Sequence, residues 1–152
     1  LCQSALRTKL YDNMLLNYFF RRFLRNQIMF ANTLFRGVCY HPSECQLVTV
    51  GTDRKVVYWE VIDGSNIREV EGSLEGDLND VQISPDGKYM VTGGKDKIIR
   101  FWFYEEGIVS RIGLGHCGAV HRIAISPNQE YIISVSSDGA VFRWKFPAEK
   151  TE

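Results

Sequence analysis

Three residue types recur along this chain of 152 residues at nearly constant intervals. A proline, an aspartate and a tryptophan each appear three times, separated by 43 and then 42 residues. The members are Pro42, Pro85 and Pro127; Asp53, Asp96 and Asp138; and Trp59, Trp102 and Trp144. Landmarks that share one period indicate an internal repeat, in which each unit buries its apolar face against the next.

Each repeat has the pattern of short strands separated by turns. A first strand ends at the proline, which can close a strand but cannot donate to its ladder. The second and third strands are rich in β-branched and aromatic residues, and a fourth is expected in two repeats only. The predicted second strands cover 46–51, 89–93 and 131–136, the third 55–61, 97–104 and 140–146, and the fourth 66–70 and 108–114. Four antiparallel strands in ~40–45 residues make one blade of a β-propeller.

The third repeat carries four polar and aromatic residues that resemble the WD40-repeat family. They are His116, which follows a glycine, together with Ser134, Asp138 and Trp144. In that family such residues form one hydrogen-bonded chain, which the resemblance implies here as a structural tetrad. An imidazole can donate to a carboxylate and accept from a hydroxyl, while an indole N–H only donates, so the four satisfy one another.

The first two repeats match this pattern in part. The partial tetrads are Thr49, Asp53 and Trp59 in the first repeat, and Thr92, Asp96 and Trp102 in the second. Counting from the third repeat places Ala31 and Leu74 at the histidine position, so the two carboxylates there need other partners. The usual Trp-Asp ending is replaced by Trp-Glu, Trp-Phe and Trp-Lys in the three repeats.

The sequence therefore predicts an all-β fold, a partial WD40 β-propeller of about three four-stranded blades. The blades are expected at 31–73, 74–115 and 116–147, the last without its outer strand, followed by a tail at 148–152. Propellers typically close with ~4–8 blades. The missing blades of a longer chain are therefore expected as partners of this one.

Residues 1–30 differ in character from the repeats. Five basic residues stand there against Asp12 alone: Arg7, Lys9, Arg21, Arg22 and Arg25. Apolar residues recur at spacings of three and four, at Leu10, Met14, Leu15, Tyr18, Phe19 and Phe23. The pattern predicts a basic amphipathic helix. It could dock on an acidic partner or a membrane surface, pack on its own protein, or belong to a different unit.

Composition excludes some classes of function. The 18 basic and 18 acidic residues cancel, which removes the electrostatic footprint of a nucleic-acid or membrane-surface binder. Four cysteines without a Cys-x-x-Cys pair favour reduced thiols in an intracellular protein. We therefore expect neither nucleic acid nor membrane among the partners.

No catalytic, metal or cofactor site is predicted. Ser134, His116 and Asp138 are the residue types of a hydrolase triad, but Ser134 lies within a strand and lacks a Gly-x-Ser-x-Gly elbow. Cys117 and His121 next to His116 offer metal ligands, yet no second cluster completes a tetrahedral site. No glycine-rich segment has the phosphate-loop pattern.

Several stretches are similar to a narrower family, the tandem WD40-propeller proteins of motile cilia. They are residues 25–44, 50–64, 68–76, 90–97 and 134–147, whereas 1–22 depart from that family. The resemblance implies a non-enzymatic scaffold of the ciliary or flagellar axoneme, part of the cytoskeleton in the cytoplasm. It further implies a microtubule inner protein of the doublet, binding tubulin and neighbouring axonemal proteins.

The sequence leaves open both the surface that would contact tubulin and an alternative function. Tubulin's acidic surface would favour basic loop residues, here Arg54, Lys55, Lys95 and Lys97. The alternative function is a WD40 adaptor subunit of another soluble multiprotein complex, such as a ubiquitin ligase or an RNA-processing assembly. Fold alone does not decide between them, because propellers host many functions.

Overall fold

The computed structural model describes residues 28–147. The regular secondary structure in these residues consists of β-strands. Each of three antiparallel sheets is called a blade here. The first blade contains β1 (Phe35–Tyr40), β2 (Gln46–Gly51), β3 (Lys55–Glu60) and β4 (Asn66–Glu71). The second contains β5 (Leu78–Ile83), β6 (Tyr89–Gly94), β7 (Ile99–Phe103) and β8 (Ile108–Gly113). The third contains β9 (Val120–Ile125), β10 (Tyr131–Ser136) and β11 (Val141–Lys145).

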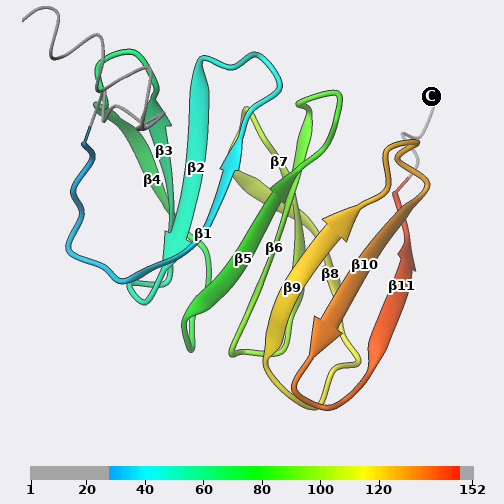
Figure 1. The fold of residues 1–152 in the computed structure, drawn as a ribbon. Helices are drawn as coiled ribbons and strands as arrows, with labels where there is room; N and C mark the ends of the chain where they lie inside the picture. Colours follow the sequence, from blue (N-terminus) through cyan, green and yellow to red (C-terminus); the bar gives the residue numbers. More distant parts are fainter. Residues whose placement is uncertain (1–27, 148–152) are drawn as a thin grey trace, which may run out of the picture.

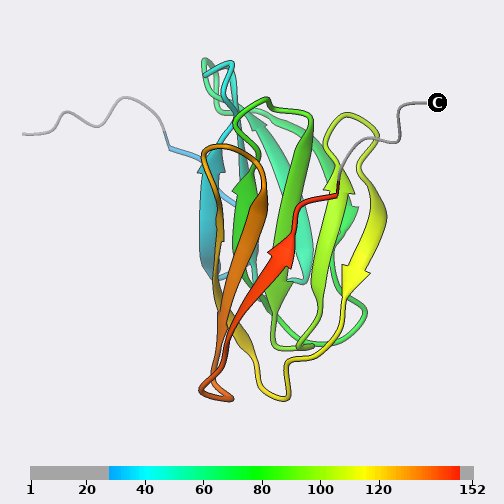
Figure 2. The ribbon, with the colours of Figure 1, turned by 90° about the vertical axis from the view of Figure 1, so that its right-hand side faces the viewer.

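The three blades stand next to one another in chain order. Their first strands lie side by side, with β5 in contact with both β1 and β9 (Figure 1). Within residues 28–147 no fourth strand pairs with β11, which leaves it as an edge that Figure 2 views from the third-blade side. The prediction of an all-β partial propeller with an incomplete last blade is confirmed.

The predicted N-terminal helix lies outside the described residues, except for 28–30, which are not helical. Residues 28–34 form an irregular lead into β1. Within the described part of the chain no helix is long and apolar enough to span a membrane. The tail at 148–152 also lies outside the described residues.

The turns repeat with the same period as the strands. Between the second and third strands of each blade, Arg54, Lys97 and Gly139 adopt φ values of 65°, 67° and 79°. This left-handed conformation is easy for glycine and costly for a side chain. Two of the three blades therefore accept strain in this turn, and both place a cation there.

Buried residues gather where blades meet. The first interface joins Val48, Val56 and Tyr58 of the first blade to a set in the second. That set is Leu78, Val81, Ile83, Met90, Trp102 and Tyr104. The second interface packs Tyr89, Val91, Ile99 and Phe101 against Val120, Ile123, Ile132 and Phe146. Every residue of β6 is buried, because the second blade is covered on both faces.

A third apolar cluster covers the free face of the first blade. Leu47, Val57 and Trp59 are buried there, with Met29 and Ala31 of the lead packed against them. The lead starts beside β3 and β4 and runs to the other end of the blade before β1 begins (Figure 1). At that far end the backbone N–H of Leu34 donates to Thr52 Oγ1 over 3.1 Å.

Candidate functional site

The third blade contains a chain of four hydrogen-bonded side chains. His116 Nδ1 lies 2.9 Å from Asp138 Oδ2, and His116 Nε2 lies 2.7 Å from Ser134 Oγ. Trp144 Nε1 donates to the same Ser134 oxygen over 2.8 Å. A carboxylate only accepts, so His116 donates from Nδ1, and a neutral ring then accepts the Ser134 proton at Nε2. The structure thus brings together all four residues that the sequence grouped.

The electrostatics of this chain keep Asp138 charged. The backbone N–H of Ala140, the His116 ring and the backbone N–H of Cys117 hold the pKa of Asp138 well below its usual range. Ser134 is fully buried, and its two hydrogen-bond partners, His116 and Trp144, are members of the same set of four side chains. A substrate has no access to this hydroxyl, so the arrangement fixes three segments of the blade instead of activating a nucleophile.

In the second blade a different pair of residues serves the equivalent carboxylate. Trp102 Nε1 donates to Thr92 Oγ1 over 2.9 Å, as its counterpart does in the third blade. Asp96 Oδ2 accepts from Ser73 Oγ over 2.8 Å and also pairs with the Arg100 guanidinium. Leu74, placed at the histidine position by counting, is 81% exposed.

The difference comes from which residue of the connection meets the aspartate, because the connections 72–77 and 114–119 have the same length. Ser73 stands five residues before β5 begins, whereas His116 stands four residues before β9. Ser73 is the second residue of its connection and His116 the third, so Ser73 and not Leu74 lies against Asp96. Counting back from the aspartate misses this, and it also misses Arg100, which follows Asp96 by four residues. A serine at the start of the connection and an arginine on the third strand were the available signals.

Of the hydrogen bonds in the third blade's set, the first blade has the one between the tryptophan and the strand hydroxyl. Trp59 Nε1 donates to Thr49 Oγ1 over 2.8 Å. Asp53 Oδ1 accepts the backbone N–H of Lys55 over 3.3 Å, and Thr33 Oγ1 accepts the backbone N–H of Asp53 over 3.2 Å. Ala31 packs on the apolar cluster around Trp59 and offers no hydrogen bond from its side chain.

Polar contacts also join one blade to the next. Asp80 is 2% exposed, and its Oδ2 accepts the backbone N–H of Ile123 over 2.7 Å. Desolvation by burial raises the pKa of Asp80 despite this bond. At the first interface Arg68 donates to the backbone carbonyls of Tyr104 and Glu105, and its guanidinium lies 4.1 Å from the centre of the Tyr58 ring. Such bonds fix the position of each blade relative to the next.

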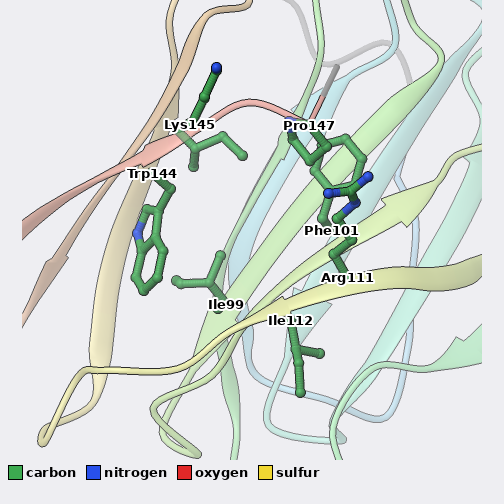
Figure 3. Close-up of a pocket in the computed structure, with 9 residues that line it drawn as sticks. Ile99, Phe101, Arg111, Ile112, Trp144, Lys145 and Pro147 are labelled. Carbon is green, nitrogen blue, oxygen red and sulfur yellow. The ribbon is translucent and has the colours of Figure 1, made fainter. Parts of the chain in front are cut away.

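A groove opens between β8 and β11, where the third blade has its free edge (Figure 3). Its cavity has a volume of about 140 Å³, and Ile99, Phe101, Ile112 and Trp144 form apolar walls. Arg111 also lines it and stands 43 residues after Arg68, which bonds to backbone carbonyls at the first interface. The groove could hold an apolar side chain next to a carbonyl or carboxylate.

The basic loop residues lie at the end of the molecule where β2 turns into β3 and β6 into β7. Arg54 Nη1 donates to the backbone carbonyl of Leu74 over 2.8 Å. Lys95 pairs with Asp77 at 2.7 Å, and Lys55 pairs with Glu69. Lys97 is exposed beside them. The four cations are thus brought to one end, with two of them in ion pairs.

The remaining candidates supply no site. Among residues 28–147 no group of three or more histidine, cysteine, aspartate or glutamate side chains could hold a metal ion. Cys117 and His121 are both exposed. The cysteines that the structure describes, Cys39, Cys45 and Cys117, are free thiols.

Comparison with known proteins agrees with this geometry. The family model "WD domain, G-beta repeat" matches residues 64–102 and 109–145. The chain is 56% identical over 126 residues to Cilia- and flagella-associated protein 52 of Sus scrofa, an alignment covering 83% of this chain and 20% of the relative. The protein of the same name from Chlamydomonas reinhardtii is 42% identical over 129 residues, which cover 85% of this chain and 21% of the relative.

A more distant relative is the Periodic tryptophan protein 2 homolog of Neurospora crassa. It is 30% identical over 151 residues, which cover 81% of this chain and 17% of the relative. The chain spans about a fifth of the length of the curated relatives that it matches. Repeated blades, hydrogen-bonded tryptophans and the family match lead to one conclusion: this chain belongs to the WD40-repeat family.

Proposed function

We propose that this chain is part of a non-enzymatic scaffold of motile cilia and flagella. The observation that carries the proposal is the 56% identity over 83% of the chain to proteins named for cilia and flagella. A related protein of that name in Chlamydomonas reinhardtii, at 42% identity, extends the likeness across distant organisms. Family membership also points to a scaffold, because WD40 blades present loops on a rigid frame.

In its finer form the proposal is a microtubule inner protein of the axonemal doublet, in contact with tubulin and neighbouring inner proteins. The loops around Arg54 and Lys97 support such contacts, because both cations sit on turns fixed by the strands on either side. A rigid loop loses little conformational entropy when it binds. Opposite charge on the partner would add steering and specificity more than raw affinity.

The test uses the full-length protein that carries this chain, tagged and expressed in ciliated cells. We expect it in the axoneme, retained after detergent and mild salt. Reversing both cations, Arg54→Glu with Lys97→Glu, should weaken retention, whereas the charge-preserving control Arg54→Lys with Lys97→Arg should leave it unchanged. Location away from cilia, complete release by mild salt, or recovery in a soluble ligase or RNA-processing complex would overturn the proposal.

A further inference from the structure

The two ends of the described propeller segment differ in charge. One end carries the turns 41–45, 61–65, 84–88, 104–107 and 126–130, which lie together at the top of Figure 1. Six exposed carboxylates occupy these turns: Glu44, Asp63, Asp86, Glu105, Glu106 and Glu130. Within residues 28–147, Lys88 is the one lysine or arginine on the same turns. We call this surface the acidic end.

At the opposite end the charges are closer to balance. The turns 52–54, 72–77, 95–98, 114–119 and 137–140 hold five carboxylates and three cations. Several of these groups satisfy one another, as in the Lys95–Asp77 ion pair at 2.7 Å. The excess of negative charge in the blades is therefore concentrated at the acidic end, where it acts as a local field.

The acidic end is continuous across the first and second blades. His41 Nε2 lies 3.2 Å from the carbonyl oxygen of Gly87, and the His41 and Tyr104 ring centres are 4.5 Å apart. Arg68 reaches the same place, but its guanidinium bonds to the backbone carbonyls of Tyr104 and Glu105. Glu105 and Glu106 thus stand on a turn that is fixed to the first blade.

Apolar side chains are exposed among these carboxylates. Ile62 is 81% exposed, and Tyr40 and Ile108 are each 57% exposed. All three lie on or next to turns of the acidic end. A surface that combines negative charge with exposed apolar groups fits a basic amphipathic segment, which can bury apolar area and neutralise charge at once.

The chain itself contains such a segment in residues 1–27. It holds five cations against one carboxylate, with apolar residues at helical spacing. The lead that follows it packs Met29 and Ala31 on the first blade and is first described beside β3 and β4, toward the acidic end (Figure 1). As a helix, 27 residues would extend about 40 Å, a length on the scale of a small domain.

We propose that residues 1–27 dock on the acidic end of their own blades. The arginines at 21, 22 and 25 face the carboxylates of the first two blades, and the apolar side chains cover Ile62 and Ile108. The segment then belongs to the same folded unit as the repeats. This inference does not depend on the ciliary role, and its test gives a separate answer.

The test is limited digestion of the 152-residue chain with an arginine-specific protease, at low protein concentration. Docking hides the bond after Arg25, and cleavage there reports the undocked population when docking is fast. We expect Glu105→Lys with Glu106→Lys to accelerate this cleavage about fivefold, as would raising the salt concentration, which screens exposed charge pairs. The matched control, Glu71→Lys with Glu75→Lys, makes the same change of net charge away from the acidic end and should leave the rate unchanged.

A compensating variant makes the test specific. Adding Arg21→Glu and Arg22→Glu to the lysine pair restores opposite charges, and protection of the Arg25 bond should return. Circular dichroism verifies that each variant keeps its strands. Equal cleavage rates in all variants would overturn the proposal, as would protection that disappears on dilution, because the segment would then dock on a second copy.

Discussion

The second and third blades solve the same local problem with different residues. Each has an aspartate on the turn after its second strand and a tryptophan whose indole bonds to a hydroxyl on that strand. His116 connects carboxylate to hydroxyl in the third blade, whereas Ser73 and Arg100 bind the carboxylate in the second. What the repeat preserves is a satisfied carboxylate, and the residue that satisfies it can change.

The blades also differ in how much surrounding protein holds them. Trp102 is 2% exposed between two neighbours, whereas Trp144 is only half-buried beside the free edge of β11. A neighbour on each face therefore supplements the hydrogen bonds in the second blade. In the third blade the bonded side chains support a sheet that, among residues 28–147, has a neighbouring blade on one face only.

The largest difference between the second and third blades is expected when their tryptophans are replaced. Trp102→Ala should lower the free energy of unfolding by about 3–5 kcal/mol, because it opens a cavity between blades. Trp144→Ala should cost about 2 kcal/mol, since less apolar area is lost. Denaturant titration followed by circular dichroism measures both. Equal losses would show that burial by neighbours adds nothing beyond the shared hydrogen bond.

The second prediction compares the two ways of binding the aspartate. His116→Ala removes two hydrogen bonds and leaves Ser134 and Asp138 short of partners, at a cost of about 2 kcal/mol. Ser73→Ala should cost about 1 kcal/mol, because Arg100 still pairs with Asp96. Ser110→Ala on exposed β8 serves as the control and should leave the denaturant midpoint unchanged. A greater loss at Ser73 than at His116 would reverse our ranking.

The third prediction concerns how two buried or hydrogen-bonded aspartates change the stability at acidic pH. The pKa of Asp138 is lowered in the folded state, so its contribution is complete above the unfolded pKa and is lost as pH falls below about 4. Asp80 has the opposite sign: burial raises its pKa, so its protonation favours the folded state in acid. The informative range is about pH 5 to pH 3, because it brackets the ordinary carboxyl pKa. In this range Asp138→Asn should flatten the fall in stability with decreasing pH, and Asp80→Asn should steepen it. Thermal midpoints recorded across this range measure both slopes, and a change of slope in the same direction in both variants, relative to the unsubstituted chain, would contradict the assignment.

The smallest effect is expected at position 74, which corresponds in sequence spacing to His116 of the third blade. Leu74→His should change the unfolding free energy by less than about 0.5 kcal/mol, because position 74 is exposed and Ser73 already binds Asp96. Denaturant titration again provides the value. A stabilisation approaching the His116 contribution would show that the second blade can adopt the third blade's arrangement.

Much of the fold could be predicted because the repeat is dense in landmarks. The sequence pattern predicts second strands at 46–51 and 131–136, which are the bounds of β2 and β10. Alternation, turn residues and period all agreed at these positions, so local and global preferences pointed to one structure. Within residues 28–147 β11 is an edge strand, as expected for a last repeat without a fourth strand pattern.

The polar partners were harder to predict, for a physical reason. Hydrogen bonds depend on distance and angle, so in two connections of equal length the residue that meets the aspartate differs by one position, Ser73 in place of Leu74. Arg100 was missed because its partner lies across a turn, and the sequence does not show which charged side chains a turn brings together. Asp80 was missed because its acceptor role requires Ile123 of the next blade.

The bonds between blades span separations along the chain that differ by less than a factor of two. Arg68 and Tyr104 are 36 residues apart, Asp80 and Ile123 are 43 apart, and Gln46 and Tyr104 are 58 apart. Loop-closure entropy grows only by about 0.6 kcal/mol for each doubling of loop length, so these closures cost nearly the same. Folding can therefore advance blade by blade, because each of these contacts joins neighbouring blades and no step has to wait for a distant part of the described chain.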